Sequence, residues 1–299
     1  MDRVNPAPSR RKGGSLGALL SWYFDSFPIW RGKGLVNRLL GRFLVITVED
    51  GIKLRLTNPL EFNQRRLLSG ATSYEPEVSA VITKAVLPGM VVADVGANLG
   101  FHSLLASKRV GRDGEVHSFE PSPAQFRHLT LNLRLNRAAN VRANNLALAD
   151  QAGVRTLFLS IGWNQGTHSL GETADSSVAC PVACTTLDAY VRDRHLTRLD
   201  VVKADVEGAE PLMLAGATQT LKTLRPGLIL VEADEGYCRA LGTSTRELKA
   251  CLQSHGYELY RLFPSKRPQP TNADFSEEHA NLAALHVAAS EHFRLALLG

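Results

Sequence analysis

The chain has 299 residues, which is enough for one large α/β domain with an N-terminal extension or for two small domains. Hydrophobic residues make up 44% and charged residues 21%, so the chain can bury an ordinary globular core. The net charge of +5 is far from that of a protein with a concentrated basic face, which argues against a nucleic-acid partner.

The apolar runs and the cysteines of the sequence argue against two further classes of protein, membrane proteins and disulfide-rich proteins. No apolar run reaches transmembrane length, and the short apolar stretch at 16–24 lacks a clear cleavage site, so we expect a cytoplasmic protein with no membrane partner. The four cysteines are too few for a disulfide framework. Cys180 and Cys184 lack the second pair that a metal site of this kind needs, so we expect reduced thiols.

The N-terminal part is expected to form an extension. We expect disorder over residues 1–14 and short helical patches over 15–42. A β-hairpin is expected over 43–56 and a helix over 76–86. Glu49-Asp50-Gly51 supplies the hairpin turn, and Pro88-Gly89 ends the helix. We therefore divide the chain into an N-terminal extension (1–70) and a main domain (71–299).

From Met90 onward, strand and helix patterns alternate. Strands are expected over residues 91–95, 115–119, 141–148, 154–161, 199–205, 227–232, 257–263 and 281–287. Helices are expected over residues 101–110, 123–136, 211–224 and 245–255. This alternation predicts a doubly wound α/β fold with a mostly parallel sheet, helices on both faces and the last two strands as antiparallel neighbours.

The first strand of this sheet ends in a glycine-containing turn, Asp94-Val95-Gly96-Ala97-Asn98-Leu99-Gly100. Ligands of an open α/β sheet bind at the carboxyl ends of the strands, and glycines there let the backbone approach a ligand closely. The turn differs from Gly-x-Gly-x-x-Gly because Asn98 replaces the second glycine, which a pyrophosphate needs. Asp94 suits a cationic nucleoside such as S-adenosylmethionine; a dinucleotide site and a plain strand–helix turn are the alternatives.

Two further acidic motifs follow later strands. The second strand ends in Phe119-Glu120-Pro121, where an acid can accept hydrogen bonds from both ribose hydroxyls. The fourth main strand closes with Lys203-Ala204-Asp205-Val206-Glu207-Gly208-Ala209-Glu210. Lys203 lies in an apolar run and needs a partner such as Asp205 or Glu207. A helix cap explains one of these acids but not three, and Glu232 at the end of the next strand points to the same crevice.

Taken in order, these motifs resemble the FkbM-type methyltransferase family. The resemblance spans about residues 74–290 and rests on the two motifs beginning at Asp94 and Phe119, on Asn132 and Asn136, on Ala147-Leu148-Ala149-Asp150, on Thr186-Leu187-Asp188, on the run from Lys203 to Glu210, and on Glu75 in the lead-in. Ala204 departs from the family, which tends to have isoleucine or a similar apolar residue there. No family motif falls in the N-terminal extension.

The resemblance implies a seven-stranded Rossmann-like methyltransferase sheet and methyl transfer from S-adenosylmethionine to a hydroxyl of a sugar or polyketide-type natural product. It further implies that Asp94, Gly96, Asn98 and Gly100 line the methionine end of the cofactor. Glu120 would then hold the ribose and Ala147 would border the adenine. Asp205 and Glu207 would lie beside the methyl group and the acceptor.

A hydroxyl acceptor reacts poorly until it begins to lose its proton, so a nearby base is expected. The candidates are Asp205, Glu232 and Lys203, with Asp205 first. A hard cation held by Asp205, Glu207 and Glu232 is an alternative, but acids after strands also serve as caps, and we expect no metal. His168, in the polar insert, is interpreted as an exposed loop residue rather than as a base on the acceptor side.

Three other functions compete with this interpretation. A nicotinamide-dependent oxidoreductase shares the sheet and the acid after the second strand, but needs the missing glycine. Nucleic-acid and amine N-methyltransferases often carry a proline pair where this chain has Asp205-Val206-Glu207-Gly208. The intact cofactor motifs argue against an inactive interaction module. The acceptor itself cannot be read from the sequence, and a homo-oligomer is compatible with it.

Overall fold

The computed structural model describes residues 44–56, 64, 67, 73–160, 168–172, 176–274 and 279–299. The expectations for residues 1–42 and for Asn164-Gln165-Gly166-Thr167 lie outside these described residues. No helix within the described ranges is both long and apolar enough to span a bilayer.

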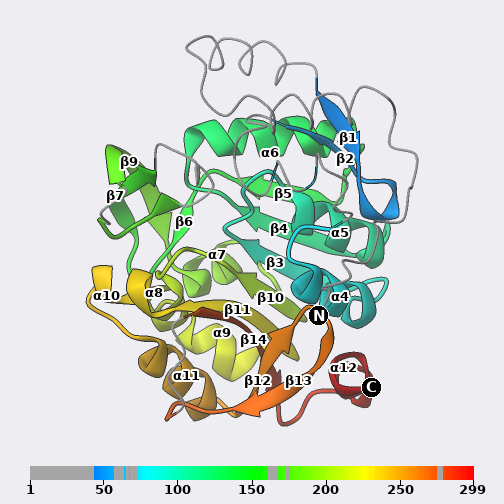
Figure 1. The fold of residues 1–299 in the computed structure, drawn as a ribbon, viewed down its shortest axis with the longest axis vertical. Helices are drawn as coiled ribbons and strands as arrows, with labels where there is room; N and C mark the ends of the chain where they lie inside the picture. Colours follow the sequence, from blue (N-terminus) through cyan, green and yellow to red (C-terminus); the bar gives the residue numbers. More distant parts are fainter. Residues whose placement is uncertain are drawn as a thin grey trace, which may run out of the picture.

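The core of the fold is an eight-stranded sheet with the order β13-β12-β14-β11-β10-β3-β4-β5 (Figure 1). Its five neighbouring parallel strands are β11 (Leu228–Asp234), β10 (Val201–Ala204), β3 (Val91–Val95), β4 (Glu115–Phe119) and β5 (Val141–Asn144). The antiparallel part is β14 (His279–His286), β12 (Tyr257–Phe263) and β13 (Lys266–Thr271). The doubly wound, mostly parallel sheet is thereby confirmed, and so is the antiparallel pairing of the last two expected strands.

The eighth strand, β13, was not expected from the sequence. It carries Pro268 and Pro270, which lack the N–H group that a ladder requires. Such residues are tolerated on an edge strand, and β13 pairs on one side only, with β12. The hairpin with β12 therefore adds one strand to the seven that the family resemblance implies.

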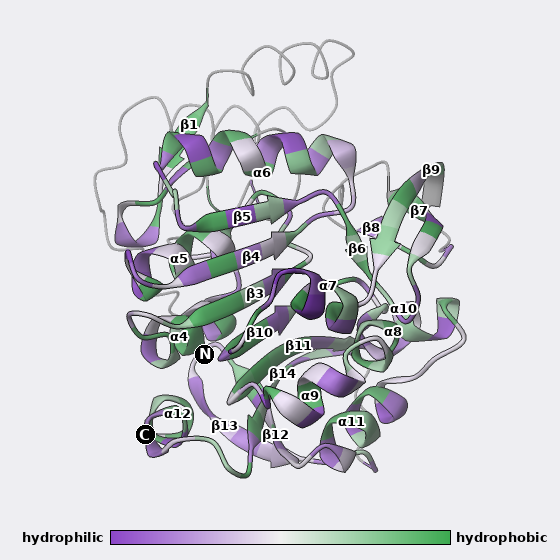
Figure 2. Cartoon of the chain, turned by 180° about the vertical axis from the view of Figure 1, so that it is seen from behind, coloured by the Kyte–Doolittle hydropathy of each residue, from purple (hydrophilic) through white to green (hydrophobic). Residues whose placement is uncertain are grey.

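Helices cover both faces of the sheet. One face packs against the set α4 (Pro76–Ala85), α5 (Phe101–Val110), α6 (Pro123–Leu135) and α12 (Glu291–Leu298). The other face packs against α7 (Leu187–Asp193), α8 (Glu210–Ala215), α9 (Thr218–Thr223) and α11 (Thr245–Ser254), with the short α10 (Glu235–Ala240) following β11. Figure 2 shows the central strands as mostly hydrophobic, as expected for strands buried on both sides.

Two expected elements are divided in the structure. The helix expected over 211–224 is two helices, α8 and α9, separated at Gly216. A Cβ atom at Gly216 would lie 2.1 Å from the carbonyl oxygen of Ala149, so the chain passes too close to its neighbour there for a side chain. The strand expected over 141–148 is β5 and a separate two-residue strand, β6 (Ala147–Leu148), which leaves the main sheet.

A second sheet, with the order β6-β9-β7-β8, stands beside the carboxyl edge of the main sheet (Figure 1). Its other strands are β7 (Gly153–Ser160), β8 (His168–Ser169) and β9 (Ser176–Thr185). The strand expected over 154–161 corresponds to β7, whereas β9 was not expected. Cys180 and Cys184 lie on β9, and neither takes part in a disulfide.

The expected N-terminal hairpin is present as β1 (Val45–Thr47) and β2 (Lys53–Arg55) around the 3-10 turn η1 (Glu49–Gly51). Asn132 of α6 and Asn136, the residue that follows this helix, bind it to the main domain. The amide of Asn132 accepts a hydrogen bond from Arg55 N at 2.8 Å and donates one to the carbonyl oxygen of Leu99 at 2.8 Å. Asn136 similarly accepts from Lys53 N and donates to Lys53 O.

Replacing Asn132 by alanine tests this attachment. The Asn132→Ala variant leaves a backbone N–H and a carbonyl group without partners in a buried place, so we expect a loss of about 1–3 kcal/mol in the free energy of unfolding. Urea denaturation measures it. Thr130→Ala on the same helix is the matched control, since its hydroxyl is exposed and bonds only within the helix. Equal stability of the two variants would contradict this role of Asn132.

Candidate active site

The loop after β3 has a backbone shape that glycine permits. Gly96 has φ +78 and Gly100 has φ +88. A Cβ atom at Gly96 would lie 1.8 Å from the carbonyl oxygen of Asp205, so this loop touches the one that follows β10. Beneath it, Asp94 is buried and accepts a hydrogen bond of 2.5 Å from Ser103 Oγ on α5.

Glu120 follows β4 and is held from both sides by backbone groups. Its Oε2 accepts from Asn98 N and its Oε1 accepts from Ser122 N, each at 2.8 Å. Burial raises the pKa of Glu120 to about 7, although these two N–H donors act in the opposite direction. Asn98 has a left-handed backbone conformation with φ +48. Its side-chain oxygen Oδ1 is buried and accepts no hydrogen bond within the protein, so it is available to a donor from a ligand.

Lys203 is the buried cation of the site. Its Nζ lies 2.9 Å from Asp205 Oδ2 and 3.8 Å from Asp94 Oδ1. Burial alone would lower the pKa of Lys203, but Asp205 and Asp94 raise it above its ordinary value. Burial likewise acts to raise the pKa of Asp205, but Lys203 holds it below its ordinary value. Both groups are therefore charged at neutral pH.

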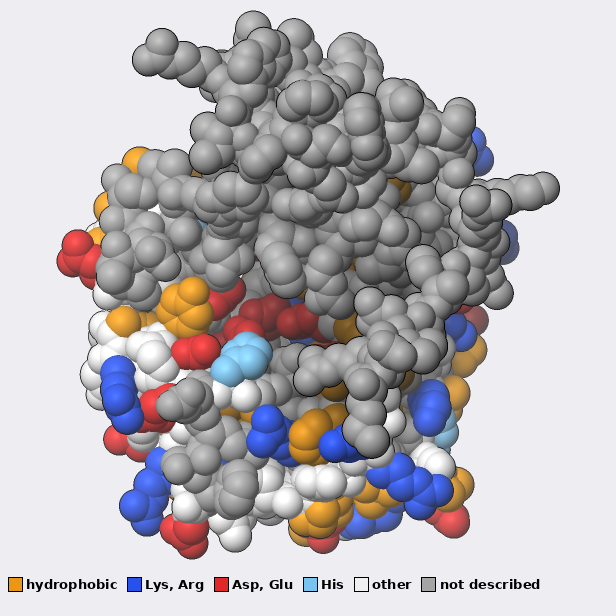
Figure 3. Space-filling view, viewed as in Figure 1, with side chains coloured by type: hydrophobic (Ala, Val, Ile, Leu, Met, Phe, Trp, Pro, Cys, Tyr) orange, Lys and Arg blue, Asp and Glu red, His pale blue; other side chains and the backbone are white. Residues whose placement is uncertain are grey.

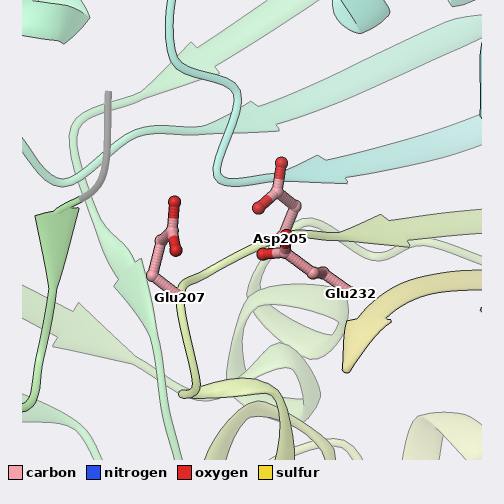
Figure 4. Close-up of side chains that lie close together, drawn as sticks. All are labelled: Asp205, Glu207 and Glu232. Carbon is pink, nitrogen blue, oxygen red and sulfur yellow. The ribbon is translucent and has the colours of Figure 1, made fainter. Parts of the chain in front are cut away.

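Glu207 and Glu232 complete an acidic group with Asp205. One oxygen from each of the three carboxylates lies within 4.8 Å of the others. Figure 4 shows Asp205 and Glu207 projecting from the loop after β10, and Glu232 reaching toward them from β11. Burial, followed by the charge of Asp205, raises the pKa of both glutamates well above the ordinary value.

The loop from 205 to 208 is fixed by contacts that the sequence analysis missed. Glu210 is fully buried and accepts a 2.7 Å hydrogen bond from Val206 N. Ser169 Oγ of β8 donates to the carbonyl oxygen of Glu207 at 2.7 Å. Gly208 has φ +91 and a Cβ atom there would lie 2.4 Å from the backbone of Tyr237. Glu210 belongs to the 203–210 run, but only the fold shows that it restrains the loop.

A cleft with an empty volume of about 750 Å³, part of it open to solvent, lies between these loops. Six of the predicted site residues line it: Gly96, Asn98, Glu120, Ala147, Asp205 and Glu207. A second cavity of about 390 Å³ shares Asn98 and Asp205 with the cleft and extends to Lys203. Among the described residues, Asp94, Gly100 and Glu232 line neither of these two cavities. Figure 3 shows acidic side chains gathered in a hollow on this face.

Several lining residues were missed because they come from distant parts of the chain. Tyr74 lines both cavities, and the cleft is also lined by Leu157 of β7 and by Leu170, which follows β8. The motif around Glu75 pointed to the segment of Tyr74, whereas no sequence signal placed the second sheet here. His168 differs from the expectation of an exposed loop residue, because it belongs to β8 and lines the cleft.

Comparison with known proteins places this site in a family. Residues 94–259 match the family model described as the methyltransferase FkbM domain. The chain belongs to the FkbM methyltransferase family.

Two relatives of known name share 28% and 29% sequence identity with this chain. The chain is 29% identical over 202 residues to the 31-O-demethyl-FK506 methyltransferase FkbM of Streptomyces tacrolimicus, covering 58% of this chain and 74% of that one. It is 28% identical over 163 residues to the hexuronic acid methyltransferase AglP of Haloferax volcanii, covering 54% and 63%. The solved structure of methyltransferase FkbM from Methylobacillus flagellatus KT has 13% identity and a TM-score of 0.44, covering 89% and 61%.

The contact between the two loops predicts a large effect of Gly96→Ala. The added methyl group meets a backbone carbonyl in a left-handed conformation, so we expect the free energy of unfolding to fall by more than about 3 kcal/mol. Gly89→Ala is the matched control, because Gly89 has φ +79 but nothing within 4 Å of a Cβ atom. Thermal and urea denaturation compare the two. If both variants lost the same stability, the close approach of the loops would be wrong.

Proposed function

We propose that this chain transfers a methyl group from S-adenosylmethionine to a hydroxyl group of a small molecule such as a sugar or a polyketide-type natural product. The observation that carries the proposal is the single cleft in which Asn98, Glu120 and the acids Asp205 and Glu207 meet. Family membership supports methyl transfer. The names of two relatives, acting on 31-O-demethyl-FK506 and on a hexuronic acid, support a small-molecule acceptor.

The residues of the cleft fit the proposed cofactor. S-adenosylmethionine supplies an electrophilic methyl group on a sulfonium when it is bound. Each Glu120 oxygen accepts one backbone N–H and keeps a second lone pair for a ribose hydroxyl. Leu146, Ala147 and Leu148 form an apolar wall that suits the adenine. The unpartnered Oδ1 of Asn98 is an acceptor for the ammonium of the amino-acid end.

Asp94 and Gly100 support this binding from beneath the ligand in our proposal. Asp94 receives the Ser103 hydroxyl, and Gly100 begins α5 where a Cβ atom would lie 2.6 Å from Leu129. Both residues thereby set the shape of the loop that carries Gly96 and Asn98. Their effect on the cofactor is one of positioning, since neither lines the cleft.

The acids on the other side of the cleft act on the acceptor. The hydroxyl oxygen forms the new bond to the methyl carbon, the carbon–sulfur bond breaks with its electron pair remaining on sulfur, and the hydroxyl proton passes to a carboxylate. Asp205 and Glu207 both line the cleft and are the candidate bases. Asp205 is the one whose pKa lies below its ordinary value, so it is ionised and able to accept the proton. Lys203 stays protonated and keeps Asp205 ionised.

Calorimetry and a labelling experiment test the proposal. We expect the purified chain to bind S-adenosylhomocysteine at one site and to transfer label from methyl-labelled S-adenosylmethionine to a small molecule in an extract of its own host. Identification of that product also shows whether oxygen or nitrogen is methylated. Binding of NAD instead of S-adenosylhomocysteine would overturn the proposal in favour of an oxidoreductase.

The raised pKa of Glu120 predicts how cofactor affinity depends on pH. In the empty cleft Glu120 holds a proton below about pH 7, whereas ribose hydroxyls donate best to the ionised carboxylate. The affinity for S-adenosylhomocysteine should therefore rise with pH, by at most about tenfold per unit, between about pH 5.5 and 7.

Titration calorimetry at several pH values measures this rise. Glu120→Gln should bind more weakly and lose the pH dependence over the same interval, which separates Glu120 from the other buried carboxylates. Glu115→Gln is the control, because Glu115 begins the strand that leads to Glu120, but its side chain is 41% exposed and pairs with Arg142. An affinity of the unaltered chain that does not change with pH would contradict the role of Glu120.

A further inference from the structure

We propose that Glu75 is a positioning residue of the methyl-transfer site, whose carboxyl group holds a proton against Nδ1 of His102 at neutral pH and thereby fixes Tyr74. The inference deepens the proposed function and rests on it, because Tyr74 lines both the cleft and the second cavity. In the sequence, the family resemblance singled out Glu75 in the lead-in without giving it a role.

The backbone of Glu75 has a conformation that glutamate rarely adopts. Glu75 precedes α4 with φ +45 and ψ +76, in the left-handed region. Glycine and asparagine adopt this region at a lower cost in free energy. The Glu75 side chain gives α4 no capping hydrogen bond in return. Strained residues of this kind cluster at functional sites, so the presence of a carboxyl group here needs an explanation outside the helix.

The hydrogen bonds of Ser79 fix the tautomer of His102. The Ser79 hydroxyl donates its one hydrogen to the carbonyl oxygen of Tyr74 at 2.6 Å. Its oxygen also lies 3.2 Å from Nε2 of His102. Since the hydroxyl hydrogen is already used, Nε2 is the donor of this second hydrogen bond. A neutral His102 therefore carries its hydrogen on Nε2, and its Nδ1 is a bare acceptor.

Nδ1 of His102 faces Glu75. Oε2 of Glu75 lies 3.8 Å from it, and this oxygen is buried and has no hydrogen-bond partner. Two bare acceptors so close together in a buried place repel each other unless a hydrogen lies between them. The distance exceeds that of a direct hydrogen bond by about 1 Å, which a small rotation of the Glu75 side chain closes. The geometry therefore favours one proton shared by the pair.

The surroundings place this proton on Glu75. Burial, followed by the charge of Asp205, raises the pKa of Glu75 to about 8. Burial, followed by the charge of Lys203, lowers the pKa of His102 to about 3. At neutral pH the pair is thus a carboxylic acid that donates to a neutral imidazole. The titratable groups other than His102 that act on Glu75 are Asp205, Lys203, Glu77, Asp94, Glu207 and Glu232.

A neutral Glu75 also leaves Lys203 to its two closest acids. Nζ of Lys203 lies 2.9 Å from Oδ2 of Asp205 and 3.8 Å from Oδ1 of Asp94. An ionised Glu75 would add a third carboxylate to the charges that this one ammonium group balances. The proton on Glu75 therefore helps Asp205 to remain the ionised base of the site.

His102 transmits the arrangement to Tyr74. The two rings meet edge to face with their centroids 6.0 Å apart, and Ser79 joins Nε2 of His102 to the carbonyl oxygen of Tyr74. A rotation of His102 would therefore move Tyr74, which belongs to the walls of both cavities. Glu75 itself lines neither of these two cavities, so it acts on a ligand only through His102 and Tyr74.

Nuclear magnetic resonance of the unaltered chain tests the proton without any ligand. With isotope-labelled histidine, we expect an imidazole with its hydrogen on Nε2 and a bare Nδ1 at neutral pH, assigned by its absence from His102→Gln. With isotope-labelled glutamate carboxyl groups, Glu75 should be a neutral acid that titrates at about pH 8, assigned by its absence from Glu75→Gln. Protonation of Nδ1 at neutral pH, or an ionised Glu75, would overturn the proposal.

Calorimetry with S-adenosylhomocysteine tests the effect on the site. Glu75→Gln keeps a neutral donor, so it should bind S-adenosylhomocysteine as tightly as the unaltered chain at neutral pH. Glu75→Leu lacks the donor and should bind about two- to tenfold more weakly, the effect of one lost hydrogen bond. Above about pH 8 the unaltered chain should lose affinity relative to Glu75→Gln, by at most about tenfold per pH unit, because its Glu75 ionises.

Glu75→Gly separates this role from that of the strained backbone. Glycine accepts the left-handed conformation but carries no donor, so this variant should bind as weakly as Glu75→Leu. Glu291→Gln is the matched control, since Glu291 is an exposed acid in the first turn of α12. Thermal unfolding shows that each variant is folded.

The positioning role is overturned if Glu75→Gln binds as weakly as Glu75→Leu, or if Glu75→Leu or Glu75→Gly binds as tightly as the unaltered chain. Absence of S-adenosylhomocysteine binding by the unaltered chain would instead overturn the proposed function, while the resonance experiment still decides where the proton lies.

Discussion

The buried ion pair between Lys203 and Asp205 determines how the carboxyl edge of the sheet is built. Lys203 lies opposite Asp94 in the register of β10 and β3, so one ammonium group faces the acids at the ends of two neighbouring strands. A buried charge destabilises the fold unless it is paired and hydrogen-bonded. This requirement ties the direction of Asp205 to the position of Asp94 and draws the loops after both strands together.

The contacts between these loops each involve a backbone group. Gly96 lies against the carbonyl oxygen of Asp205, and Asn98 donates its N–H to Glu120 on the third loop. Loops after three adjacent parallel strands thus restrain one another, through backbone atoms and through the Glu120 carboxylate. The result is a cleft whose shape depends on main-chain geometry, which accounts for the glycines and the left-handed Asn98 in this short segment.

The elements that are determined locally could be predicted from the sequence. Buried apolar runs gave the parallel strands, and the turn at 94–100 and the acids Glu120, Asp205 and Glu207 were placed at the edge where the structure has them. Elements that depend on distant partners could not be predicted. β13 contains two prolines and exists because β12 offers an edge, while the second sheet brings Leu157 to the cleft through long-range pairing.

The carboxylates of the site differ in the partners that the fold gives them. Glu120 and Glu210 each accept backbone N–H groups, and Asp205 has Lys203 as its partner. Glu232, by contrast, has only side-chain neighbours: Asp205 and, at 3.6 Å, the imidazole of His279. Partners supplied by the fold make the first group part of the structure, whether or not a ligand is bound.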